Sequence, residues 1–213
     1  MERIVKRMLL EQRDDLTKRG VEHFQIVHFT IQADHLHLIV EASDKRGLAR
    51  GIAGLEVRIA RRLNALLGRK GRFWSDRYHR RDLRTPTETR NVLRYVLLNS
   101  QKHHRVIGER AFADPHSSAA TFDGFARAPA TFETRDPWPW VKPRTWLLGV
   151  GWRRHGLLDP ADVPPSSPHR VVGVRATDSD VGAENARMAR RRSDGRTTAC
   201  TSMQVRYSPA PIS

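Results

Sequence analysis

Residues 32–41 read Gln32-Ala33-Asp34-His35-Leu36-His37-Leu38-Ile39-Val40-Glu41, the pattern of a β-strand that carries two histidines. Successive side chains of a strand point to opposite faces, so His35 and His37 share one face while Leu36, Leu38 and Val40 share the other. Imidazole is a common metal ligand, and two such ligands leave most of the coordination sphere of an ion open. The pair therefore suits a catalytic ion, although a strand edge with two ordinary histidines is the simpler interpretation.

The residues before this strand predict a helix and a second strand. Apolar residues at helical spacing between Ile4 and Leu16 predict an amphipathic helix that ends at Gly20. Residues 23–32 are rich in β-branched and aromatic side chains and indicate a strand. Because Ala33-Asp34 then turns the chain, the two strands should form an antiparallel hairpin.

Two more helices are predicted after the hairpin. Residues 47–67 repeat apolar side chains every three or four positions. Residues 85–88 combine a threonine N-cap, a proline at the first helical position and the glutamate of a capping box, and this helix should run to about Lys102. On it, Tyr95, Asn99 and Lys102 are three or four residues apart and form one stripe beside the apolar face.

The chain is strongly basic, and the charge is local. Its 213 residues include 38 Lys+Arg against 23 Asp+Glu, a formal net charge of +15. Residues 45–105 alone hold 17 Lys+Arg against 4 Asp+Glu. Because each neutralised phosphate releases condensed counterions, such a surplus favours a polyanionic partner. A solvated charged face accounts equally well for the arginines of the helix over 47–67.

Residues 68–71 end the helix over 47–67 and open a basic loop. Arginines and aromatic rings are interleaved in its continuation, which reads Arg72-Phe73-Trp74-Ser75-Asp76-Arg77-Tyr78-His79-Arg80-Arg81. Rings can stack on unpaired bases while guanidinium groups follow the phosphates, a combination that suits single-stranded nucleic acid. Phe73 and Trp74 are more typical of core residues, whereas Tyr78 and the arginines are better candidates for contacts.

Cysteine content and hydropathy limit the class of protein. The single cysteine, Cys200, excludes an intramolecular disulfide and a cysteine-based zinc cluster, and it favours a reducing compartment. The first ten residues lack the apolar core of a signal peptide, and no stretch approaches the roughly 18 apolar residues that a membrane span needs. We therefore expect a cytoplasmic protein without a membrane partner, as a monomer or a homodimer.

The pattern weakens after residue 106. Residues 145–158 hold one short apolar segment, and from Pro164 onward Pro, Ser, Gly and Arg dominate without apolar periodicity, which predicts disorder. We accordingly divide the chain into a catalytic domain over 1–110, an irregular extension over 111–163 and a disordered tail over 164–213.

Three segments within about residues 20–105 carry a family resemblance: Asp34-His35-Leu36-His37-Leu38-Ile39-Val40, then Gly71-Arg72-Phe73-Trp74-Ser75-Asp76-Arg77-Tyr78-His79, then Tyr95-Val96-Leu97-Leu98-Asn99. In this order they resemble the single-tyrosine HUH transposases, in particular the REP-associated branch. The resemblance implies an α+β fold with a ferredoxin-like antiparallel sheet and helices on one face. It also implies an enzyme that cleaves and rejoins single-stranded or hairpin DNA through a 5′-phosphotyrosine intermediate.

The resemblance also implies roles for individual residues. Tyr95 would be the nucleophile, while His35, His37 and Asn99 would hold Mg²⁺ or Mn²⁺. Gln101 is the weaker third ligand because it lies about 120° from Tyr95 around the helix, whereas Asn99 lies about 40° away. A tyrosine with a pKa of about 10 needs help to lose its proton, which the metal or Lys102 could supply. A partly buried tyrosine of the helix core is the simpler interpretation of Tyr95.

We call residues 45–105, which carry the charge surplus, the basic region. Its cationic and aromatic side chains are the candidate DNA contacts: Arg58, Arg61, Arg62, Arg72, Arg77, Tyr78, His79, Arg80 and Lys102. Members of the family generally begin with a β-strand that is central in the sheet, whereas this sequence begins directly at the first helix. We therefore expect a sheet without its middle strand, with unpaired backbone groups on the neighbouring strands. The main alternative function is then a truncated, non-catalytic protein that binds hairpin DNA or RNA, and the third is a metal-dependent hydrolase of another phosphoester.

Overall fold

The computed structural model describes residues 1–18, 20, 22–75, 78–99, 113–129, 138–139, 141–162 and 199–207. The helices are α1 (Glu2–Lys18), α2 (Lys45–Leu66), α3 (Pro86–Leu97) and the short α4 (Trp146–Gly149), with 3-10 helices η2 (Ala119–Thr121) and η3 (Gly151–His155). The strands are β1 (Phe24–Ile31), β2 (His35–Ala42), β3 (His79–Asp82) and β4 (Ala199–Arg206). These elements and their antiparallel sheet belong to the predicted α+β class. No helix in the described ranges is long and apolar enough to cross a membrane.

The central strand of the sheet comes from the far end of the sequence. The strand order is β1-β2-β4-β3, and β4 runs antiparallel to both of its neighbours. The predictions of a disordered tail and of a sheet without its middle strand are therefore wrong for residues 199–207. Residues 199–206 supply the backbone partners that β2 and β3 would otherwise lack. The rest of the predicted tail, residues 164–198 and 208–213, lies outside the described part of the chain.

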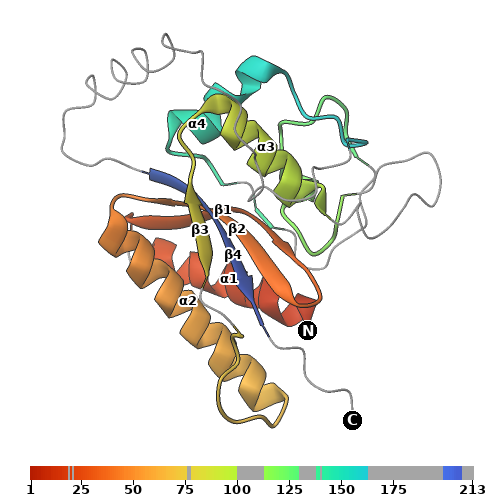
Figure 1. The fold of residues 1–213 in the computed structure, drawn as a ribbon. Coiled ribbons are helices and arrows are strands. Elements are labelled where there is room, and N and C mark those ends of the chain that lie inside the picture. Colours follow the sequence, from red (N-terminus) through yellow and green to blue (C-terminus); the bar gives the residue numbers. More distant parts are fainter. Residues whose placement is uncertain are drawn as a thin grey trace.

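Helices cover both faces of the sheet (Figure 1). The predicted layer on one face consists of α1 and α2, whose apolar residues pack against Phe29, Leu36 and Leu38. On the opposite face α3 and residues from the 113–158 region pack against Ile39 and Cys200. Because neighbouring residues of a strand alternate between faces, the histidines of β2 point toward α3.

Side-chain caps begin two of the helices, and the cap at Thr85 is the one that the sequence predicts. Asp44 caps α2 by accepting a hydrogen bond from the backbone N–H of Gly47. Thr85 caps α3 by accepting from the N–H of Glu88 at 3.2 Å. The Glu88 carboxylate in turn accepts from the N–H of Arg84 at 3.0 Å, one residue before the cap. The prediction that α3 runs to Lys102 is too long, because the helix ends at Leu97.

Glu41 anchors the C-terminal extension to the sheet. This carboxylate is fully buried on β2, on the same face as the histidines. It accepts hydrogen bonds from the backbone N–H groups of Arg144 and Thr145, both at 2.8 Å, and from the Thr145 hydroxyl at 2.6 Å. Gln25 on β1 donates to it as well, at 2.6 Å. Hydrogen bonds to Glu41 thus hold the segment that begins α4 against the α3 side of the sheet.

Candidate active site

His35 and His37 project from β2 on the same face, with ring centroids 4.7 Å apart in an edge-to-face arrangement. His37 is buried and His35 is half-buried. Asp34 Oδ1 lies 2.5 Å from His35 Nδ1. A carboxylate can only accept, so His35 Nδ1 carries the proton and, in a neutral ring, the Nε2 lone pair stays available for another partner. Carboxylates support metal-binding imidazoles in this way in many proteins.

Tyr95 reaches His37 from α3. Its hydroxyl oxygen lies 3.4 Å from His37 Nε2, and the two ring centroids are 4.9 Å apart. The tyrosine is only 8% exposed. Burial raises the pKa of Tyr95, and the positive charge of Arg206 acts in the opposite direction. The predicted nucleophile and one predicted ligand are therefore in contact, although 58 residues separate them in the sequence.

Asn99, the third predicted ligand, is buried just beyond the end of α3. Gln101 and Lys102 lie outside the described residues. In the described ranges, no three His, Cys, Asp or Glu side chains form a group that could hold a metal ion. An ion bound by His35 and His37 would therefore need amide or water oxygens to complete its sphere. Two imidazoles on one face, one of them supported by Asp34, fit such an ion.

Strand β4 adds two polar side chains that the sequence analysis missed. Gln204 is the partner of His37 on β2 and of His79 on β3, and Arg206 is the partner of His35. Residues directly opposite each other in a sheet project from the same face. Gln204 and Arg206 therefore lie on the face that carries the two histidines, in a segment that had been assigned to a disordered tail.

The aromatic residues of the basic loop belong to the core. Phe73 is 2% exposed and stacks on Tyr207 with ring centroids 5.6 Å apart. Trp74 donates its indole N–H to the Glu56 carbonyl oxygen at 3.0 Å. Tyr78, predicted as a DNA contact, is half-buried and packs against the same core.

The predicted DNA contacts fall on both sides of the sheet. His79 and Arg80 are neighbours on β3, so His79 points to the α3 side and Arg80 to the α1–α2 side. The exposed arginines of α2 also belong to the α1–α2 side, and Arg58 pairs there with Asp15 at 3.2 Å. Arg77 lies outside the described residues. The remaining predicted contacts, Arg61, Arg62 and Arg72, are exposed.

Other titratable groups on the α3 side have structural partners. Burial lowers the pKa of His28 to about 3, so this ring is neutral. Its Nδ1 lies 3.2 Å from the Ser118 hydroxyl. Burial raises the pKa of Asp114, whose carboxylate accepts from the Thr30 hydroxyl at 3.3 Å and from the N–H of His116 at 2.8 Å. His28 and Asp114 hold residues 113–122 against β1.

One of three comparisons with known proteins found a match. Neither a search of curated proteins nor a search of solved structures found a match. Residues 10–99 match the family model described as "Transposase IS200 like". The matched range runs from α1 through α3 and includes both histidines, Tyr95 and Asn99. Through these residues the chain is similar to the IS200-like transposases.

Proposed function

We propose that this protein is a transposase that cleaves and rejoins single-stranded, hairpin-forming DNA, with Tyr95 as the nucleophile. The observation that carries the proposal is the contact between Tyr95 and His37, with 3.4 Å between the phenolic oxygen and Nε2. A helix and a strand distant in sequence bring a nucleophile and a metal-ligand side chain together, which is the arrangement that covalent, metal-assisted chemistry requires. The REP-associated branch within the family remains a prediction.

Each step of the reaction forms one phosphoester bond and breaks another, so the number of these bonds does not change. The Tyr95 oxygen loses its proton and attacks the scissile phosphorus, forming a bond between the phenolic oxygen and phosphorus. The bond from phosphorus to the 3′ oxygen breaks, and that oxygen takes up a proton to become a free 3′-hydroxyl. The 5′ end stays on the enzyme as a phosphotyrosine, so a second 3′-hydroxyl can reverse the step and join a new strand without ATP.

His35 and His37 would hold the divalent ion, Mg²⁺ or Mn²⁺, with Asn99 as the proposed third ligand. When bound, the ion would polarise the scissile phosphate. Asp34 contributes by fixing the His35 ring, since its carboxylate accepts from Nδ1 at 2.5 Å. Burial of His37 excludes water from the inner part of the site and strengthens electrostatic interactions there.

DNA binding rests on the basic region. The exposed arginines of α2 and Arg80 lie on the side of the sheet away from Tyr95, and His79 lies on the same side as Tyr95. A DNA hairpin that contacts both groups has to pass an edge of the sheet. Each phosphate contact adds to the salt dependence of binding.

One observation favours a second candidate, a protein that binds hairpin DNA without cutting it. Tyr95 is only 8% exposed, and burial raises its pKa. For cleavage, DNA binding must expose the hydroxyl to the phosphate. The binding candidate needs neither this opening nor the histidines.

The two candidates differ in whether a covalent adduct forms. We expect the protein, incubated with a labelled hairpin and Mn²⁺, to give an adduct that resists denaturing electrophoresis. Tyr95→Phe removes only the attacking oxygen and should abolish the adduct while hairpin affinity stays within about threefold. His37→Ala should abolish it through the metal. Tight hairpin binding without an adduct from the unmodified protein would establish the binding candidate.

Tyr207→Phe is the matched control, because it removes a hydroxyl that donates to the Gln32 carbonyl oxygen, outside the site. This variant should still form the adduct. An adduct that persists in Tyr95→Phe would place the nucleophile elsewhere, with Tyr78 as the next candidate.

A further inference from the structure

The strand that completes the sheet also brings a cation to the proposed site. Arg206, on β4, is directly opposite His35 on β2, and the two side chains project from the same face. The Arg206 side chain is exposed. The positive charge of Arg206 opposes the rise in the pKa of Tyr95, which accords with a position on the α3 side of the sheet.

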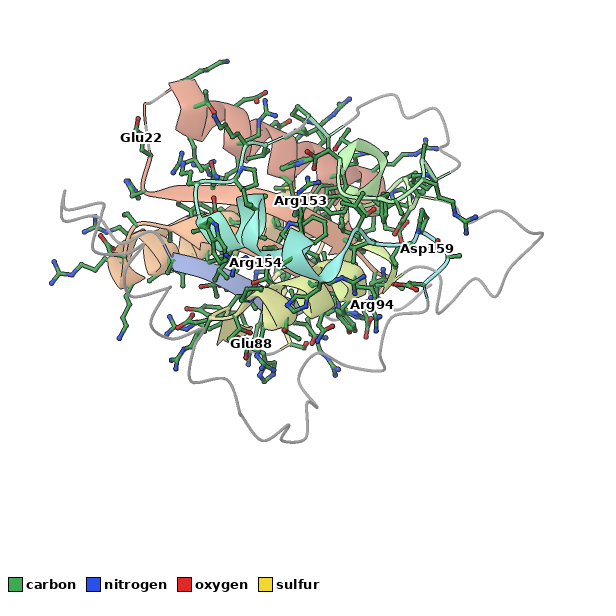
Figure 2. All side chains as sticks on the ribbon, turned by 90° about the horizontal axis from the view of Figure 1, so that it is seen from above. Glu22, Glu88, Arg94, Arg153, Arg154 and Asp159 are labelled. Carbon is green, nitrogen blue, oxygen red and sulfur yellow. The ribbon has the colours of Figure 1, made fainter. Side chains whose placement is uncertain are left out.

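Other arginines on this side of the sheet are already engaged. Figure 2 looks onto this side, where Arg94 lies on α3 and Arg153 lies on η3. Both form ion pairs within the chain, Arg94 with Asp162 at 3.8 Å and Arg153 with Asp123 at 2.8 Å. Arg81 on β3 likewise pairs with Glu88 at 2.7 Å. Among the residues that the structure describes, no carboxylate lies within ion-pair distance of Arg206. The exposed guanidinium on β4, opposite His35, therefore has no carboxylate to neutralise it within the described chain.

We propose that Arg206 is a further residue of the strand-transfer site and that its guanidinium binds the non-bridging oxygens of the scissile phosphate. The inference rests on the proposed function. A phosphate attacked by Tyr95 has to lie beside the phenolic oxygen and the two histidines, and Arg206 borders that position from β4. Arginine suits the task because its planar fork donates two parallel hydrogen bonds to a phosphate. The negative charge on these oxygens grows as the phenolic oxygen attacks, so the contact should be stronger in the transition state than in the ground state.

The kinetic test compares three variants at saturating hairpin. Arg206→Gln should slow adduct formation by about 100-fold, the loss typical of removing one donor to a developing charge. Arg206→Lys keeps the charge without the fork and should fall between the glutamine variant and the unmodified protein. Arg127→Gln is the matched control, because it removes the same charge from an exposed arginine paired with Asp159. A glutamine variant that reaches the unmodified rate at saturation would overturn the proposal.

A binding test does not depend on catalysis. In the Tyr95→Phe background, a set of hairpins each carries one neutral methylphosphonate linkage in place of a phosphate. One linkage should weaken binding by about 10-fold when Arg206 is present, as expected for a hydrogen-bonded charge pair. Arg206→Gln should erase that penalty at the same linkage only. The proposal fails if every linkage keeps its penalty in the glutamine variant.

The two tests separate the inference from the proposed function. Absence of an adduct from the unmodified protein contradicts the proposed function, whereas the methylphosphonate series still reports whether Arg206 binds a defined phosphate. When adducts do form, the linkage that depends on Arg206 should be the one that is cleaved. Dependence on a different linkage would refute the assignment to the scissile phosphate.

Discussion

Met203 tests whether β4 completes the sheet, and Met203→Ala is the perturbation. The side chain is 1% exposed, between Leu38 on β2 and Arg80 on β3, and it faces the core formed with α1 and α2. Truncation to alanine removes buried apolar atoms and leaves a cavity between the sheet and the helices α1 and α2. The strand itself is held by backbone pairing on both of its edges. Substitutions of this type cost about 2–5 kcal/mol, and the near-complete burial places the expected loss at about 3 kcal/mol.

Urea and thermal unfolding, followed by circular dichroism, measure this loss. A change of about 3 kcal/mol should lower the melting temperature by roughly 6–12 °C for a chain of this size. Leu66→Ala on α2 is the control, because it shortens a side chain that is 56% exposed. The control should change stability by no more than about 0.5 kcal/mol. If Met203→Ala behaves like this control, residues 199–206 do not form the central strand and the assignment of Arg206 to the site fails with it.

Three more predictions concern pH, the extension and the DNA contacts. Because burial lowers the pKa of His28 to about 3, the unfolded chain takes up this proton first as pH falls below 6.5. Stability should therefore decline by up to about 1.4 kcal/mol per pH unit between pH 6.5 and 3, and His28→Asn should flatten this part of the urea-midpoint profile. Glu41→Gln places an amide donor among the N–H groups of Arg144 and Thr145 and should cost about 2–4 kcal/mol in urea unfolding, against less than about 0.5 for the exposed Glu11→Gln. Neutralising Arg72 and Arg80 together should lower the slope of log affinity against log salt by about 2, and an unchanged slope would make them part of a solvated face.

The hairpin and three long helices could be predicted because their signals are local. The alternation across β2 and the cap at Thr85 depend on residues a few positions apart, and the structure has both. The family resemblance supplied the pairing of the histidine strand with the distant helix of Tyr95, and the contact between His37 and Tyr95 is a finding of the structure. Where signals were local but ambiguous, as for Phe73 and Trp74, the more common role as core residues is the observed one.

Strand β4 escaped prediction for a physical reason. A strand whose two faces are both buried usually reads as a continuous apolar run. Here Thr201 and Ser202 are buried among the apolar positions, so the run is interrupted. The alternation of Met203, Val205 and Tyr207 with polar residues was present, but it is short and follows a segment dominated by Pro, Ser, Gly and Arg. What makes it a strand is pairing with β2, which lies more than 150 residues earlier in the sequence, and single-sequence patterns do not register such pairing.

The position of β4 makes assembly of the site and completion of the sheet one event. β2 carries His35 and His37, yet one of its edges has no partner until Ala199–Arg206 arrive. The same strand also pairs with β3, which leads directly into α3 and hence to Tyr95. Loss of β4 would therefore remove Arg206 from the site and leave only the packing of α3 on β1 and β2, through Val27 and Ile39, to hold Tyr95 against His37. Contacts of such long sequence separation form late because the entropy of loop closure opposes them. Catalytic competence should then appear only when the last strand is in place.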